Sequence, residues 1–228
     1  MTWVLTVDID GTITENGNGI IHLGALSSLR SAAASGHRVI YVTGRSSIEA
    51  YILSIFGGTG DVAVGENGGC ITHEASSHTM LGDITKCQQA LKVLQSHIPN
   101  VQQKPVFPRM TEVVLNRTFD IKEGQDVIRD ANLDVELSDS GYAYHINSTG
   151  IDKGRGVREI MSLYDISSEN IIAIGDSITD IPMFKEAGIS VTVSNAVPDV
   201  KECADIVTSS PKGDGVVEAL QILAPRMV

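Results

Sequence analysis

Apolar positions in the first seventy residues follow two alternating patterns. Short continuous runs rich in β-branched residues predict buried strands, and spacings of three or four residues between the runs predict helices. The segments are strands at 4–9, 38–42 and 62–64 and helices at 23–35 and 46–57. Strands that alternate with helices in this way favour a parallel sheet with helices packed on its faces.

The second of these helices carries the clearest local signal. Ser46 and Glu49 form a capping-box pattern, in which each side chain can bond to the other residue's backbone N–H. Ile48, Ile52 and Ile55 then fall on one face of the helix. We therefore interpret Ser46 as a helix N-cap rather than a ligand.

The middle of the chain follows a different pattern. Apolar spacings predict helices at 84–94 and 122–131, and strands are expected at 111–116, 133–137 and 142–146. The last two strands flank the turn-forming residues 138–141, which predicts an antiparallel hairpin. Two helices with antiparallel strands suit a small α+β module.

After Gly150 the alternation of strands and helices returns. Strands are predicted at 170–174, 189–193 and 206–207, and helices at 157–164, 178–187, 197–204 and 215–223. The simplest organisation is one α/β domain, residues 1–82 and 151–228, interrupted by the α+β module at residues 83–150. A module of about 70 residues is an ordinary size for a small domain.

Charge and cysteine content exclude several classes of protein. Lys and Arg number 17 against 28 Asp and Glu, a net charge of −11 without a basic run, so nucleic-acid binding is not expected. The three cysteines are scattered without a CxxC pair, which argues against a zinc knuckle or a redox motif. No apolar run approaches the roughly 18 residues of a membrane span, and the first residues lack the features of a signal peptide. We therefore expect a cytoplasmic protein that does not bind membranes.

Polar residues gather where the predicted strands end. The carboxyl ends of parallel strands meet at one sheet edge, and ligands bind there. Four acids, one hydroxyl and one lysine fall at this edge or where the chain returns to it: Asp8, Asp10, Asp176, Asp180, Thr43 and Lys153. Carboxylates on one side repel unless a cation or proton lies between them. Because the set contains oxygen donors and no His or Cys, it suits Mg²⁺ better than zinc.

Taken singly, these residues have simpler explanations. Asp8 and Asp10 could form a solvated strand end, and Asp180 could serve the dipole of the following helix. Arg45 could bind an anion or pair with an acid. The coincidence of all the segments on one edge is what favours a functional site.

The same segments, in the same order, resemble the four motifs of the haloacid dehalogenase-like hydrolase superfamily. They read Val7-Asp8-Ile9-Asp10-Gly11-Thr12, Val42-Thr43-Gly44-Arg45, Lys153, and Gly175-Asp176-Ser177-Ile178-Thr179-Asp180. The resemblance implies a Rossmann-like parallel-sheet core, with residues 83–150 as the inserted small α+β cap domain. One position departs from the superfamily, because Thr179 stands where its last motif usually has asparagine.

Further segments resemble one branch of this superfamily. Residues 65–69, which read Gly-Glu-Asn-Gly-Gly, together with Asn195-Ala196 and residues 213–216, resemble the sugar-phosphatase branch. The sequence around His145 and residues 150–153 is most similar to the archaeal phosphoglycolate phosphatases.

The resemblance also implies roles for individual residues. Asp8 is then the nucleophile that takes the phosphoryl group, and Asp10 is the general acid and base. Mg²⁺ is held by Asp8, the backbone carbonyl of Asp10, Asp176 and Asp180. Thr43, Lys153 and Asn195 bind substrate.

A carboxylated substrate needs a cation in the cap. We expect Arg109 to bind it, with Arg117 as the alternate, whereas His145 is more often a packed or solvated residue than a ligand. The predicted function is Mg²⁺-dependent hydrolysis of a small phosphomonoester, phosphoglycolate, through an aspartyl-phosphate, by a monomer or homodimer. The alternatives are a phosphatase of a larger sugar phosphate, a phosphomutase or phosphotransferase, and a non-catalytic sugar-phosphate binding protein.

Overall fold

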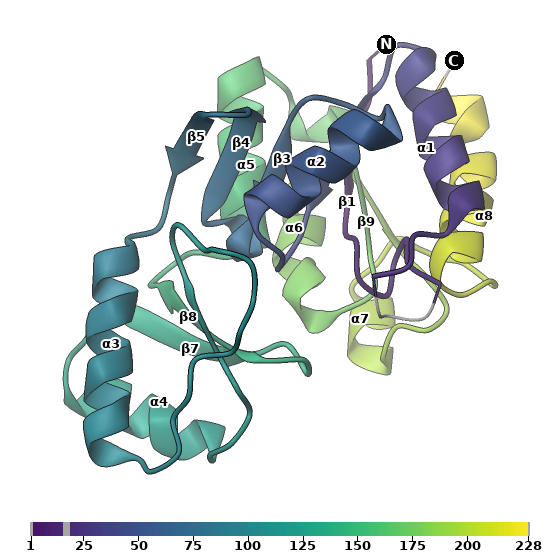
Figure 1. Cartoon of the computed structure of the whole chain (residues 1–228). Coiled ribbons are helices and arrows are strands. Elements are labelled where there is room, and N and C mark those ends of the chain that lie inside the picture. Colours follow the sequence, from purple (N-terminus) through teal and green to yellow (C-terminus); the bar gives the residue numbers. More distant parts are fainter. Residues whose placement is uncertain (1, 16–18, 228) are drawn as a thin grey trace.

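The computed structural model describes residues 2–15 and 19–227 and contains two separate β-sheets. Residues 1, 16–18 and 228 lie outside the described part of the chain. The larger sheet has eight strands in the order β11-β10-β9-β1-β2-β3-β4-β5, and the smaller has three in the order β6-β8-β7. Figure 1 shows the smaller sheet at one end of the molecule, on the side of the large sheet where β5 leads into α3.

The larger sheet is parallel over most of its width. Its strands are β1 (Val4–Val7), β2 (Arg38–Val42), β3 (Ala63–Gly65), β4 (Cys70–Glu74), β5 (Ser77–Met80), β9 (Ile171–Gly175), β10 (Ile189–Thr192) and β11 (Ile206–Val207). Every neighbouring pair from β11 to β3 is parallel, whereas β3 with β4 and β4 with β5 are antiparallel. This confirms the predicted parallel-sheet core, but the β4–β5 hairpin that extends it was not predicted.

Helices cover both faces of this sheet. They are α1 (Leu23–Ala34), α2 (Ser47–Gly57), α5 (Lys153–Tyr164), α6 (Ile181–Glu186), α7 (Pro198–Glu202) and α8 (Lys212–Leu223). One apolar cluster joins α1, α2 and α8 to one face, and a second joins α5, α6 and α7 to the other. The adjacent residues Val4 and Leu5 enter opposite clusters, because successive strand side chains point to opposite faces. None of the helices in residues 2–15 and 19–227 combines the length and apolar character that crossing a membrane requires.

The face of α2 that carries the isoleucines is not the side that meets the core. The helix begins as predicted, with Ser46 as N-cap in a complete capping box with Glu49. Its buried residues are small or polar, namely Ser47, Ala50, Ser54 and Gly57. Ile48, Ile52 and Ile55 lie on the opposite, partly exposed side, so α2 approaches the sheet closely through its small residues.

Two boundaries differ from the prediction for local reasons. The helix predicted at 178–187 is a 3-10 turn, η3 (Ile178–Asp180), followed by α6. Pro182 lies in the first turn of α6, where a missing N–H costs nothing. The cap hairpin turns later than predicted, because Ser140 and Ala143 bond to each other across residues 140–143.

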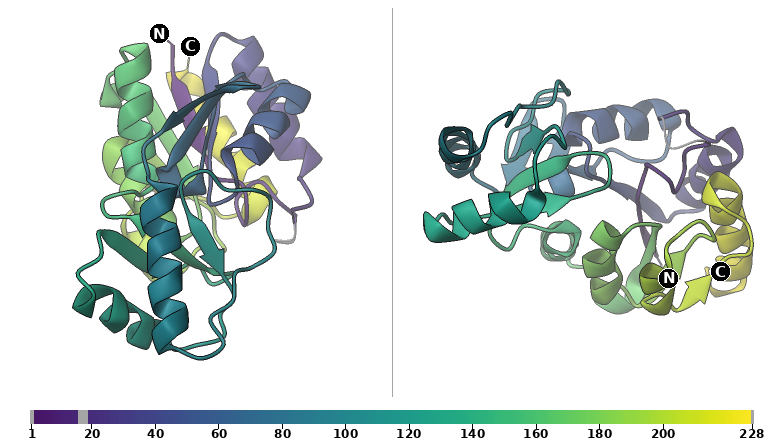
Figure 2. Two further views of the ribbon diagram at one scale, coloured as in Figure 1. Left: turned by 60° about the vertical axis from the view of Figure 1, so that its left-hand side comes forward. Right: turned by 90° about the horizontal axis from the view of Figure 1, so that it is seen from below.

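The inserted segment, residues 83–150, is called the cap below. It contains α3 (Ile84–His97), β6 (Val113–Leu115), α4 (Ile121–Asp130), β7 (Val135–Asp139) and β8 (Tyr144–Ser148). Its three strands are antiparallel, and α3 and α4 pack against them around a core of their own; Figure 2 shows both helices on one side of this small sheet. This confirms the α+β character of the insert. The domain limits themselves, 1–82, 83–150 and 151–228, stay a prediction, and their ends at 1 and 228 fall outside the described residues.

Candidate active site

A buried lysine joins two acids at the edge of the parallel sheet. Lys153, the first residue of α5, donates from Nζ to Asp8 Oδ1 and to Asp180 Oδ1, each at 2.6 Å. Asp8 follows β1, and Asp180 ends the turn that follows β9. All three side chains are at least 95% buried. The structure therefore brings together Asp8, Asp180 and Lys153, three of the charged residues that the sequence analysis places at one sheet edge.

Asp176 extends this cluster, and polar residues hold it in place. Thr12 Oγ1 lies 3.2 Å from both Asp8 Oδ2 and Asp176 Oδ1 and can donate its one proton to either. Asn195 donates to Asp176 Oδ2 at 3.0 Å and to the Gly11 carbonyl at 3.1 Å. The structure thus brings Asn195 against an acid, whereas we had predicted it to bind substrate.

Burial controls the ionisation of this cluster. It is the largest cause that raises the pKa of Asp8 well above its ordinary value, and the opposing charge of Lys153 only partly offsets it. Burial, followed by the Asp180 carboxylate, raises the pKa of Asp176 to about 6. Burial disfavours the charged form of Lys153, but the two carboxylates outweigh it and its pKa is raised. Three acids and one ammonium group are therefore gathered here, and the raised pKa values of Asp8 and Asp176 mean that their ionised forms are disfavoured without a further cation.

The donor set fits a divalent cation that prefers oxygen. Asp8, Asp176 and Asp180 each offer one carboxylate oxygen within 4.8 Å of the others. Asp180 Oδ2 already accepts from Asp176 N, Ser177 N and Ser177 Oγ, so this residue also holds the turn. Asp8 and Asp176 keep more free lone pairs, and all the donors are the hard oxygen ligands that Mg²⁺ takes.

Asp10 lies apart from the acid cluster and pairs with Arg45. The guanidinium donates through Nε to Asp10 Oδ2 at 2.7 Å and through Nη2 to Asp10 Oδ1 at 2.8 Å. Arg45 also contacts Glu49 Oε1 at 3.2 Å. Of the two alternatives left open for Arg45, the structure shows the acid pair. Each Asp10 oxygen keeps a second lone pair for another donor.

A cavity of about 540 Å³ opens above these groups and extends to the cap. The residues that line it include Asp8, Asp10, Thr43, Arg109, His145 and Lys153. Thr43 follows β2, and its Oγ1 accepts from Arg45 N at 3.1 Å, which leaves its hydroxyl proton for another acceptor. Among the described residues, the cavity therefore has core acids and Lys153 at one end and cap residues at the other.

The cap wall contains a buried charged cluster that the sequence analysis only half identified. Glu112 has a fully buried side chain and lies 3.2 Å from Arg109 Nη1 and 2.9 Å from His145 Nδ1. Arg109 Nη1 also donates to the Gly44 carbonyl at 2.9 Å, directly after Thr43. The buried Nε of Arg109 has no hydrogen-bond partner among the described residues. Arg117, the predicted alternate, instead pairs with Asp139 and is about half exposed.

Two core residues that the sequence analysis gave no role also reach the cap. Glu66 and Asn67 form η1 (Glu66–Gly68), directly after β3. Glu66 accepts hydrogen bonds from Met110 and Thr111, and Asn67 Nδ2 lies 3.3 Å from Glu112 Oε2. The Gly-Glu-Asn-Gly-Gly sequence was the available signal, but it did not reveal what these side chains would touch.

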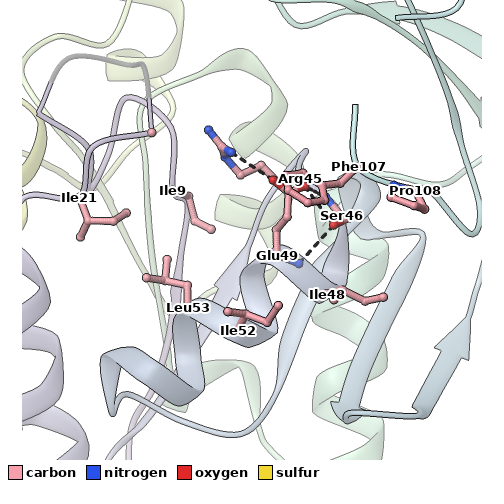
Figure 3. A pocket seen from close by; sticks show the side chains of 11 residues that line it. Ile9, Ile21, Arg45, Ser46, Ile48, Glu49, Ile52, Leu53, Phe107 and Pro108 are labelled. Atoms are coloured by element: carbon pink, nitrogen blue, oxygen red, sulfur yellow. Dashed lines mark hydrogen bonds and ion pairs between the residues drawn. The ribbon is translucent and has the colours of Figure 1, made fainter. Parts of the chain in front are cut away.

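A second cavity, of about 390 Å³, adjoins the first and is largely apolar. Figure 3 shows Ile9, Ile21, Ile48, Ile52 and Leu53 around it, with the polar residues of the α2 N-terminus beside them. Among its described lining residues the only acid is Glu49, which is bound to Arg45 and to Ser46. The chemistry therefore belongs to the first cavity.

Solved structures share this architecture. A structure from Thermoplasma acidophilum matches the full length of both chains with a TM-score of 0.86 at 24% identity. A sugar phosphatase of HAD subclass IIB matches over the full length of both chains with a TM-score of 0.79 at 20% identity. At these identities the likeness shows the fold alone.

Sequence relatives cover nearly the whole chain. A phosphoglycolate phosphatase of Nitrosopumilus maritimus is 58% identical over 219 residues, which are 96% of this chain and 95% of that protein. A phosphoglycolate phosphatase of Archaeoglobus fulgidus is 40% identical, with 96% of each chain covered. The family model of haloacid dehalogenase-like hydrolases matches residues 5–104 and 114–220. The chain belongs to the haloacid dehalogenase-like hydrolase family.

Proposed function

We propose that this protein is a Mg²⁺-dependent phosphatase that hydrolyses phosphoglycolate to glycolate and phosphate through an aspartyl-phosphate on Asp8. The observation that carries the proposal is the buried Asp8–Lys153 pair at one end of a cavity whose other end holds Arg109 and His145. The names of the archaeal relatives support the same class of enzyme.

Asp8 is suited to act as the nucleophile. Its carboxylate oxygen would attack phosphorus, so that an Asp8 O–P bond forms as the bond from phosphorus to the glycolate oxygen breaks. Lys153 offsets the negative charge that gathers as carboxylate and phosphate approach, and its two 2.6 Å contacts hold Asp8 in one orientation. Thr43 can donate its hydroxyl to an oxygen of the transferring group.

Asp10 is suited to move the protons. It would donate one to the departing glycolate oxygen and then take one from the water that attacks the aspartyl-phosphate. One group can do both, because the two steps require its opposite protonation states. The paired contacts with Arg45 fix the orientation of the Asp10 carboxylate toward the cavity.

Asp8, Asp176 and Asp180, with the backbone carbonyl of Asp10, would hold the Mg²⁺ ion. When bound, the ion neutralises charge on the carboxylate and the phosphate that would otherwise repel each other. The protein's own part is to supply oxygen donors already gathered within 4.8 Å.

The charge of the cap, rather than the size of the cavity, favours phosphoglycolate. A cavity of about 540 Å³ also admits larger sugar phosphates. However, a protein of net charge −11 repels a second carboxylate unless a local cation receives it. Arg109 lines the cavity, its buried Nε has no partner among the described residues, and a guanidinium fork binds carboxylates well.

A substrate panel tests the substrate. Purified protein with Mg²⁺ is assayed for phosphate release from phosphoglycolate, several hexose phosphates and p-nitrophenyl phosphate. We expect the highest kcat/KM for phosphoglycolate, without need for a sugar acceptor. A higher kcat/KM for a hexose phosphate, or transfer to an acceptor in place of release, would overturn the assignment.

Metal binding is tested separately from turnover. We expect a chelator to abolish activity, Mg²⁺ to restore it, and Ca²⁺ to restore it poorly, since Ca²⁺ accepts looser coordination. Titration calorimetry should show Mg²⁺ binding that is strongly weakened in Asp176→Asn. Full activity in the chelator, or unchanged binding by that variant, would contradict the metal site.

A further inference from the structure

The loop after β3 has an unusual backbone that its surroundings impose. Glu66, Asn67 and Gly68 are consecutive residues with positive φ angles of 56°, 53° and 96°. Two of them are not glycine, so this conformation persists only where neighbouring structure enforces it. Gly68 is required there, since a Cβ atom would lie 1.9 Å from the Asp152 carbonyl oxygen. The loop therefore packs closely against Asp152, the residue that precedes Lys153.

The side chain of Glu66 forms hydrogen bonds with the cap. Its side chain is completely buried, and its carboxylate accepts from Met110 N at 2.9 Å, Thr111 N at 2.7 Å and Thr111 Oγ1 at 2.8 Å. Burial raises the pKa of Glu66, and these donors oppose that effect. Both donating residues follow Arg109 directly in the chain, so the contact fixes the segment that carries the guanidinium.

The same loop is fixed to the phosphate end of the cavity. Glu66 N donates to the Arg45 carbonyl at 2.7 Å, and Asn67 N donates to the Thr43 carbonyl at 3.1 Å. Asn67 Nδ2 lies 3.3 Å from Glu112 Oε2 and 3.4 Å from His145 Nδ1. Two adjacent residues thus contact residues 43 and 45 through their backbone and the cap through their side chains.

We propose that Glu66 is a positioning residue that sets selectivity for the leaving group, by holding Arg109 at a fixed place relative to the groups that bind phosphate. The proposal rests on the proposed function, in which Arg109 receives the carboxylate of the substrate. Glu66 itself touches no reacting atom. Its effect should appear as a change in the ratio of two substrates rather than as loss of all turnover.

The test compares a substrate with a carboxylated leaving group against one without it. Glu66→Gln keeps the size of the side chain but removes its charge, and when the amide oxygen takes the place of Oε2 an N–H₂ group faces Met110 N in the place of Oε1. We expect the ratio of kcat/KM for phosphoglycolate over p-nitrophenyl phosphate to fall roughly tenfold, mostly through KM. Thr111→Val removes one donor from the same contact and should lower the ratio in the same direction but less. Glu123→Gln, on the exposed face of α4, should leave the ratio unchanged.

A double-mutant cycle identifies the route of the effect. If Glu66 acts through Arg109, Glu66→Gln should change the ratio less than about twofold in an Arg109→Lys background. An equal fall in both backgrounds, equal losses on both substrates, or no change in Glu66→Gln and Thr111→Val would each overturn the proposal.

Failure of the proposed function is recognised separately in the wild-type protein. If its best substrate is another phosphomonoester, the phosphoglycolate assignment fails. The ratio is then measured with that substrate over p-nitrophenyl phosphate. A fall in this second ratio in Glu66→Gln would support the positioning role, and an unchanged ratio would overturn it.

Discussion

The two ends of the cavity are built in different ways. At the phosphate end, Asp8, Thr43 and Asp176 follow strands β1, β2 and β9, which are adjacent and parallel in the sheet. At the leaving-group end, Arg109 and His145 belong to the cap and depend on contacts with other side chains. In the proposed function, backbone topology therefore positions the groups of the chemical step, whereas interactions between side chains position the groups that meet the leaving group.

This difference predicts two kinds of variant. Changes at the phosphate end should lower turnover of all substrates, because every phosphomonoester presents the same phosphoryl group. Changes at the leaving-group end should alter the ratio between substrates, because only some of them carry a carboxylate.

The largest effect is expected at Asp8. Asp8→Asn should lower turnover of every substrate by a factor on the order of ten thousand or more, and should abolish covalent phosphate labelling, since an amide is a poor nucleophile. The fold should persist, because Lys153 keeps its 2.6 Å contact with Asp180. Phosphate release, acid-stable labelling and a thermal melt measure these three outcomes. Near wild-type turnover would contradict the nucleophile assignment.

Asp10→Asn provides the matched comparison at the same end. It should lower hydrolysis of phosphoglycolate by roughly a hundredfold to ten-thousandfold, since glycolate leaves poorly without a proton. Labelling from p-nitrophenyl phosphate should survive, because that leaving group needs little protonation. If Asp10→Asn also abolished labelling, Asp10 would act before or with the nucleophile rather than as acid and base.

A smaller and selective loss is expected at Arg109. Arg109→Ala should lower kcat/KM for phosphoglycolate roughly tenfold to a hundredfold, the range expected for a charge-assisted hydrogen bond. The value for p-nitrophenyl phosphate should fall less than about threefold. The alanine also leaves the buried Glu112 with His145 as its ionisable partner. Arg109→Lys is therefore measured as well, because it keeps the positive charge but removes the two-pronged guanidinium.

Arg117→Ala is the control for this experiment. Arg117 is an arginine of the cap that pairs with Asp139 at the surface, so both substrates should react as in the wild type. Equal losses on both substrates in Arg109→Ala would show that Arg109 is structural. In that event the division between the two ends would fail at the cap.

Much of the fold could be predicted because it follows from local patterns. Continuous apolar runs identified β1, β2 and β9, since strands buried on both faces need no polar alternation. The β4–β5 hairpin escaped because its sequence, Cys70 to Met80, contains His73, His78 and several hydroxyl residues without an apolar period. It lies at the sheet edge, where burial on both faces is not required.

The candidate site was predictable to a different extent at its two ends. Asp8 and Asp176 could be found because a strand end fixes where its residue lies once the sheet is parallel. Glu66 and Glu112 could not, since the contact of Glu66 with Thr111 joins segments 45 positions apart, and the contact of Glu112 with His145, 33 positions apart, depends on how β6 pairs with β8. No periodicity encodes such a pairing. For Asn195 the sequence indicated a polar residue near the site, but it did not indicate which group the side chain would contact.

A moderate effect of pH on stability is expected at the phosphate end. The pKa of Asp176 in the folded protein is about 6, above the value of about 3.9 for an unfolded aspartate. The folded state therefore binds its proton more tightly, and the free energy of unfolding of the metal-free protein should rise as pH falls through 6. Allowing for solvent screening, the gain between pH 7.5 and 5.5 should be about 0.5–0.8 kcal/mol.

Thermal or urea unfolding in a chelator measures this effect, and Asp176→Asn should reduce the slope with pH. Mg²⁺ should reverse the trend, because a bound cation favours the ionised carboxylates. The same pH dependence in Asp176→Asn as in the wild type would show that other groups cause it. The cap variants Arg109→Lys and Glu123→Gln should leave the dependence of stability on pH unchanged. That result would assign the pH dependence to the phosphate end of the cavity.

The smallest effect is expected at Thr179, which stands between the two ends. Its Oγ1 lies 2.8 Å from Ser177 Oγ, and the residue is partly buried and lines the cavity. Thr179→Asn, which introduces the residue usual at this position of the motif, should change kcat/KM by less than about threefold, because polar substitutions outside the core seldom cost more than about 0.5 kcal/mol. A change shared by phosphoglycolate and p-nitrophenyl phosphate would assign Thr179 to the phosphate end. A change in their ratio would instead show that the leaving group reaches the turn after β9, and that selectivity is not confined to the cap.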